Sequence, residues 1–109
     1  MTNYSLNNLA SKIEFDPVDF AALLELFLDT TDSDLNKISS AIAISDKDLI
    51  FGSVHNIKGA SLNLGLDKIT EFMEKISKLN KSGLFTDIEG IVSKTRLEIS
   101  RLRETLEKN

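Results

Sequence analysis

Residues 17–44, PVDFAALLELFLDTTDSDLNKISSAIAI, predict one long helix and with it the fold class. Their apolar side chains recur at gaps of three and four, which is the period of an amphipathic helix. Asp16 can cap the N-terminus, and Pro17 suits the first helical position, where no backbone N–H is needed. The polar stretch 30–34 could instead start a second helix. Because the apolar stripe keeps its phase across that stretch, we expect one continuous helix.

Two further segments flank this long helix. Residues 5–13 carry apolar side chains at helical spacing and predict a short helix before the proline. After the long helix, Ser45-Asp46-Lys47-Asp48 has the Ser-x-x-acid form of a capping box and predicts the start of a third helix. Gly65 is expected to end that helix in the left-handed conformation.

The remaining residues predict two more helices. One spans about residues 67–81, and Thr86-Asp87-Ile88-Glu89 is a capping box that opens the last helix. Each long segment has one apolar stripe, which it can bury against the others. We therefore expect an all-α fold, an antiparallel up-down-up-down four-helix bundle with a short additional N-terminal helix. Residues 1–109 are expected to form a single domain, with the bundle core at about residues 16–108.

The composition excludes several kinds of site. The chain has 109 residues, one histidine and no cysteine, which excludes disulfide scaffolds, thiol nucleophiles and metal sites built on cysteine or on several histidines. The remaining metal candidates are aspartates that fall where helix caps are expected, namely Asp32, Asp34, Asp46 and Asp48. We expect no metal ion and no cofactor in this chain.

Charge and hydropathy bear on partners and location. The 13 basic residues are dispersed and outnumbered by 17 acidic ones, for a net charge of −4, which argues against nucleic acid as a partner. No apolar run approaches the ~20 residues that span a bilayer, and residues 1–5 lack the basic and apolar regions of a signal peptide. We expect a cytoplasmic protein that does not bind membranes, with a monomer as its simplest state. The methionine start and the length favour a free-standing protein.

The single histidine, His55, falls in the third predicted helix. At 100° per residue, Ile50, Val54 and Ile57 share one face of that helix, and His55 points away from it. A buried core histidine is the common alternative for a lone imidazole, and this phase argues against it. We therefore expect the His55 side chain to be exposed.

The residues around His55 suggest more than a solvated surface. Gly52 and Gly59 lie on the same face, and each costs about 1 kcal/mol relative to alanine inside a helix. Their missing side chains leave room for the backbone of another molecule. Phe51 and Leu62 add exposed apolar area of the kind found on docking surfaces.

These features fit the transient carriage of a phosphoryl group. A histidine with an ordinary pKa of about 6.5 is largely neutral at pH 7, which leaves a nitrogen lone pair for nucleophilic attack. Lys58, one turn from His55, brings a cation that can stabilise phosphoryl oxygens. Phosphoryl transfer needs mainly positioning and charge stabilisation, so a partner can supply the rest, including a metal ion.

Residues 55–65, HNIKGASLNLG, resemble the signature of histidine-containing phosphotransfer (HPt) domains, His-x-x-Lys-Gly-small-small-x-x-x-Gly. The resemblance implies that the histidine accepts a phosphoryl group from a receiver-domain aspartate and passes it to another receiver in a multistep phosphorelay. It implies that His55 is the phosphoacceptor at Nε2, that Lys58 stabilises the phosphoryl group and that Gly59 allows the receiver to approach. Gly52 is expected to support that approach.

The resemblance also implies supporting residues on the following helix. Ser77 stands where some members carry a residue that hydrogen-bonds the imidazole, and Lys81 where a basic residue lies near the phosphate. Phe51, Leu62 and parts of the long helix after Pro17 would form the surface on which a receiver docks.

Partners follow from the same resemblance. They are expected to be response-regulator receiver domains and a hybrid sensor kinase, with magnesium supplied by the receiver. The chain has no glycine-rich nucleotide loop, so we expect no ATP-dependent kinase activity of its own. The alternative, from another functional class, is a helical-bundle scaffold that binds a receiver or another partner and carries no phosphate.

Overall fold

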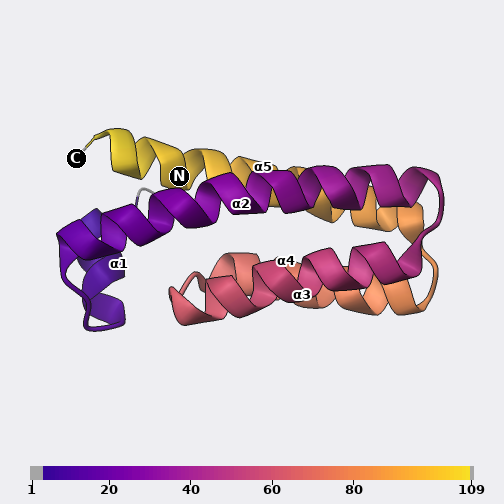
Figure 1. Cartoon of the computed structure of the whole chain (residues 1–109), viewed down its shortest axis with the longest axis horizontal. Coiled ribbons are helices and arrows are strands. Elements are labelled where there is room, and N and C mark those ends of the chain that lie inside the picture. The colour runs from indigo at the N-terminus through magenta and orange to yellow at the C-terminus, as the bar shows by residue number, and fades with distance from the viewer. Residues whose placement is uncertain (1–3, 109) are drawn as a thin grey trace.

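The structure is a computed structural model that describes residues 4–108. These residues form α-helices and no strand, which confirms the predicted all-α class. Four long helices lie side by side as a bundle, and a short helix lies beside the N-terminal part of the first long one (Figure 1). In the described residues the helices are α1 (Leu6–Lys12), α2 (Pro17–Ala43), α3 (Lys47–Asn63), α4 (Asp67–Lys81) and α5 (Phe85–Glu107).

Each long helix packs against two others. α2 contacts α3 and α5, and α4 contacts the same two helices, so that one core lies between the four. All four helices bury most of the apolar stripe that their sequences predict, and the exceptions are Leu23 and Leu49, which are exposed. The largest fully buried side chains are Phe20, Leu24, Leu28, Leu35, Ile38, Ile50, Ile57, Ile69, Met73, Ile76, Ile88 and Leu102.

α2 runs without a break through the polar stretch 30–34, as predicted. Its cap is Asp16, whose carboxylate accepts a hydrogen bond from the backbone N–H of Val18 at 2.8 Å, and Pro17 is the first helical residue. Within the polar stretch, Thr31 is buried on the apolar side. The continuous apolar periodicity therefore predicts the course of α2 better than the possible capping residues within it.

The capping box predicted at residues 45–48 is wrong. Ser45 lies outside the helix with a φ of 53°, and Asp46 is the cap, accepting a hydrogen bond from the N–H of Leu49 at 3.0 Å. The short connection from α2 to α3 needs a residue in the left-handed region to turn the chain, and Ser45 occupies that position. The helix therefore begins one residue later than the sequence pattern indicates.

The capping box predicted at residues 86–89 is also wrong. α5 begins at Phe85, with Leu84 in the N-cap position and no capping bond from a side chain. Gly83, at a φ of 70°, turns the chain just before the helix, and Phe85 packs against the core. Phe85 is partly buried against the core as the first residue of α5, so Thr86 already lies in the first turn of the helix.

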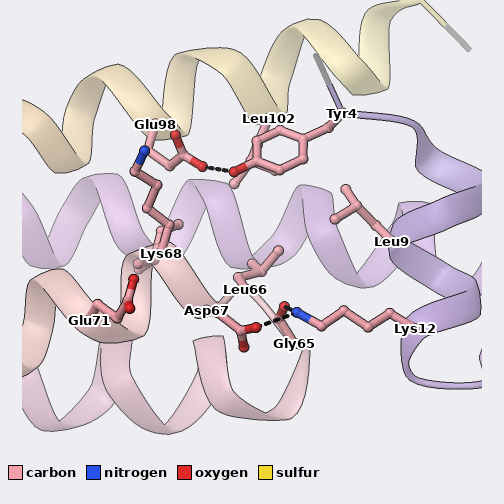
Figure 2. A pocket seen from close by; sticks show the side chains of 11 residues that line it. Tyr4, Leu9, Lys12, Gly65, Leu66, Asp67, Lys68, Glu71, Glu98 and Leu102 are labelled. Carbon is pink, nitrogen blue, oxygen red and sulfur yellow. Dashed lines mark hydrogen bonds and ion pairs between the residues drawn. The ribbon is translucent and has the colours of Figure 1, made fainter. Parts of the chain in front are cut away.

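Polar contacts hold the N-terminal segment against the bundle (Figure 2). The Lys12 ammonium donates to the carbonyl of Gly65 at 2.7 Å and pairs with Asp67 at 2.5 Å. Nearby, the Tyr4 hydroxyl donates to Glu98 of α5, whose side chain is buried. Burial and the hydrogen bond to Glu98 raise the pKa of Tyr4, so its hydroxyl stays protonated and remains a donor near neutral pH.

Gly65 follows the end of α3 in the left-handed conformation, as predicted, with a φ of 69°. A Cβ added there would lie 2.9 Å from Cγ2 of Ile13, closer than real Cβ contacts allow. Both the backbone conformation and the approach of α1 therefore require glycine at this position.

We predict that Gly65→Ala lowers the free energy of unfolding by about 1–3 kcal/mol, because it adds left-handed strain and a clash with Ile13. Urea titration followed by circular dichroism measures the change. Gly90→Ala is the matched control, since Gly90 lies inside α5 with open space around it and should gain about 0.5–1 kcal/mol. A Gly65→Ala protein as stable as the parent would contradict the prediction.

Candidate phosphoacceptor site

His55 lies near the middle of α3 with its side chain exposed, as predicted. Ile50, Val54 and Ile57 are buried on the other side of the helix. Burial of that face fixes how α3 is rotated in the bundle, so the imidazole must face solvent. The helical periodicity of the sequence therefore predicts the exposure of His55 correctly.

Gly52 and Gly59 are exposed on the same side of α3 as His55. A Cβ added to either glycine would meet nothing within 4 Å. Packing inside this chain therefore does not require glycine at either position, although glycine weakens a helix. The open space lies outside the protein, where another molecule can approach.

Phe51 and Leu62 present large apolar side chains to solvent, 60% and 58% exposed. The Phe51 ring is stacked on the imidazole of His55, with ring centroids 6.1 Å apart and an angle of 17° between the planes. Phe51 and His55 are four residues apart on one helix, which is the spacing at which side chains meet.

Lys58 does not contact His55 in this structure. Its ammonium lies 3.6 Å from Oε2 of Glu74 on α4, and both side chains remain substantially exposed. Such a surface pair contributes at most about 1 kcal/mol. Glu74 is a site residue that sequence analysis missed, because the pairing depends on how α3 and α4 are aligned.

The same ion pair shows where Ser77 and Lys81 lie. Residue numbers fall along α4 as they rise along α3, since Ser61 hydrogen-bonds Thr70 at 2.7 Å while Lys58 pairs with Glu74. Ser77 is three residues beyond Glu74, which places it about level with His55, three residues before Lys58. Lys81 lies one turn further along α4, level with Phe51.

Neither supporting residue on α4 contacts the imidazole. In the described residues no hydrogen bond joins His55 to Ser77 or to Lys81. Ser77 is half-buried, and Lys81 is exposed with its backbone carbonyl accepting a bond from Lys47 at 3.4 Å. The roles expected for both side chains stay predictions.

A shallow hollow of about 330 Å³ lies between α2 and α3 beside the imidazole, lined by His55, Phe51, Gly52 and Asn56 of α3. α2 contributes Asp34 and Lys37 to it. Burial raises the pKa of Asp34, and Lys37, 3.9 Å away, partly opposes the shift. The α2 side of the site thus carries one cation and one partly desolvated carboxyl group.

An apolar groove of about 390 Å³ continues the α2–α3 surface toward the other end of α3. α2 lines it with Leu23, Leu26 and Phe27, and α3 with Ala60 and Asn63. No charged side chain lines the groove. The contribution of the long helix after Pro17 to a docking surface stays a prediction.

No group of three histidine, aspartate or glutamate residues gathers as a metal site within residues 4–108. Three of the four aspartates that the sequence left as metal candidates have other contacts. Asp46 caps α3, Asp32 pairs with Arg103 at 2.5 Å, and Asp34 pairs with Lys37. The hollow of about 270 Å³ drawn in Figure 2 contains none of the predicted site residues.

No helix of the described part of the chain combines the length and the apolar character needed to cross a bilayer.

Comparison with family models identifies the class of protein. The model of the Hpt domain matches residues 22–105, from the first turns of α2 to near the end of α5, and the match includes His55. The chain belongs to the Hpt domain family, and the predicted resemblance is confirmed. Comparison with curated proteins and with solved structures gave no match.

We predict that Gly59→Ala raises the free energy of unfolding by about 0.5–1 kcal/mol, because the new methyl group meets no neighbour and alanine favours the helix. Thermal and urea unfolding measure the change, with Gly90→Ala expected to give a similar gain. A destabilised Gly59→Ala protein would show that packing within the chain requires the glycine.

Proposed function

We propose that this protein carries a phosphoryl group on His55 between receiver domains of a multistep phosphorelay. The observation that supports this most strongly is an exposed imidazole at the middle of α3, within the part of the chain that matches the Hpt domain. An antiparallel up-down-up-down four-helix bundle holds it in place. The chain acts in the cytoplasm as a monomer, and its partners are response-regulator receivers and a hybrid sensor kinase.

The proposed reaction is a reversible phosphoryl transfer. The lone pair of His55 Nε2 attacks the phosphorus of a receiver aspartyl phosphate, and the N–P bond forms as the bond from phosphorus to the aspartate oxygen breaks. The electron pair of that bond returns to the aspartate carboxylate, while the proton stays on Nδ1 of the imidazole. The next receiver reverses the step. Magnesium is supplied by the receiver, and this chain phosphorylates nothing from ATP.

Lys58 supplies positive charge for the phosphohistidine. Its pair with Glu74 is exposed and weak, so the ammonium can exchange the carboxylate for phosphoryl oxygens on the adjacent turn. Lys81 provides a second cation one turn away on α4, and Ser77 offers a hydroxyl at the level of the imidazole. Gly52 and Gly59 let the receiver backbone come close.

Receiver docking uses the exposed apolar side chains of α2 and α3. Phe51 and Leu62 lie on α3 on either side of His55 along the helix, and Leu23 and Leu26 extend the surface onto α2. A bundle that docks a receiver on this surface but carries no phosphate is the alternative function. It is favoured by the absence of a hydrogen bond from Lys58, Ser77 or Lys81 to the imidazole within residues 4–108.

Incubation with aspartyl-phosphorylated receivers tests the proposal against the alternative. We predict phosphate that is labile in acid and stable in alkali on the parent protein and none on His55→Gln. Because His55 is exposed, the substitution should leave the bundle folded, which circular dichroism verifies. Label on both proteins would contradict the role given to His55, and label on neither across several receivers that still bind would support the scaffold.

Lys58→Ala should lower the population of the phosphorylated state, and Glu74→Gln should not. Loss of Lys58 removes a charge-assisted contact and should shift the transfer equilibrium away from phosphohistidine by about tenfold. Glu74→Gln frees the same ammonium and should leave phosphohistidine equally or more populated. Equilibrium labelling with one receiver measures both ratios, and an equal loss in the two variants would contradict the role given to Lys58.

A further inference from the structure

The imidazole of His55 is stacked on an aromatic ring. No hydrogen bond or ion pair joins His55 to any other residue in the described part of the chain, 4–108. The side chain that contacts it is Phe51, in a near-parallel arrangement with ring centroids 6.1 Å apart. The ring stacked on the candidate nucleophile therefore belongs to the same helix.

We infer that Phe51 is a positioning residue for phosphoryl transfer, which holds the His55 ring by stacking so that its reactive nitrogen faces the incoming phosphoryl group. This inference rests on the proposed function of His55. It assigns Phe51 a role within the isolated protein, in addition to the apolar area that it offers to a docking partner.

The geometry suits this role. Helical side chains lean toward the N-terminus, so the imidazole leans over the preceding turn, which carries Phe51. Centroid separations of about 4.5–7 Å are those at which aromatic rings attract one another in an offset arrangement. With an angle of 17° between their planes, the two rings are nearly parallel, as in a stacked arrangement.

A fixed ring orientation matters because His55 is exposed. An exposed side chain samples several rotamers, and only those that aim the attacking nitrogen outward can react. Stacking lowers the population of the unreactive His55 rotamers before the partner arrives. Less side-chain entropy is then lost on reaching the transition state. Ser77 is level with the His55 ring but makes no hydrogen bond to it, so Phe51 orients the ring in the unphosphorylated protein.

Positioning and docking can be separated by the choice of substitution and of donor. Phe51→Leu keeps an apolar side chain for docking but removes the flat face, whereas Phe51→Tyr keeps the face. Phosphoramidate is a small donor that needs no docking surface. Its P–N bond breaks as the bond from phosphorus to the imidazole nitrogen forms, and the amine leaves as ammonia.

With phosphoramidate, we expect Phe51→Leu to lower the rate of His55 phosphorylation by about 2- to 10-fold and Phe51→Tyr to restore it. The matched control is Leu97→Ala on α5, which removes an apolar side chain of similar exposure, 55%, and should leave the rate unchanged. A Phe51→Leu rate equal to that of the parent, or an equal loss in Phe51→Tyr, would overturn the inference.

Nuclear magnetic resonance of the unphosphorylated protein separates this inference from the proposed function. Contacts between Phe51 and His55 ring protons and a single His55 rotamer are expected in the parent, with rotamer averaging in Phe51→Leu. Several averaged rotamers in the parent would overturn the inference whether or not the protein is labelled. An ordered ring in a parent protein that no donor phosphorylates would instead refute the proposed function while leaving the stacking intact.

Discussion

Burial of the apolar stripe of α2 is the interaction on which the rest of the structure depends. α2 is the longest helix of the described chain and packs against α1, α3 and α5. Phe20, Leu24 and Leu28 in its first half and Leu35 in its second half are fully buried, so both ends of the bundle are anchored on one element. Because α3 packs against α2 and α4 along its inner face, that packing also determines which residues lie on its outer face.

The outer face of α3 carries residues that lower the stability of the helix and leave room for another molecule. Gly52 and Gly59 weaken α3 without relieving any clash, and Phe51 exposes apolar area that a core would bury. A helix with these residues persists because Ile50 and Ile57 pack into the core on its other side. The residues that disfavour the isolated helix are therefore the ones that a partner would meet, as expected of a functional surface.

Local periodicity accounts for what could be predicted from the sequence. It gave the helices, the cap at Asp16, the left-handed Gly65 and the exposure of His55, because each depends on residues close in the chain. The two capping boxes failed because chain reversal at Ser45 and burial of Phe85 decide where the helices begin. Contacts across helices, such as that of Lys58 with Glu74, were missed because they require the alignment of α3 against α4.

α3 carries most of the proposed chemistry on one rigid element. The nucleophile His55, the aromatic ring of Phe51 and the cation of Lys58 all project from it, so their spacing does not change when the bundle flexes. α4 contributes Glu74, whose carboxylate lies 3.6 Å from the Lys58 ammonium. In the proposed transfer we expect one local exchange, in which a phosphoryl group replaces Glu74 as the partner of Lys58. Because both side chains of this pair are substantially exposed, the exchange would need no helix to move. We therefore propose that the receiver that donates the phosphoryl group and the receiver that accepts it use the same docking surface.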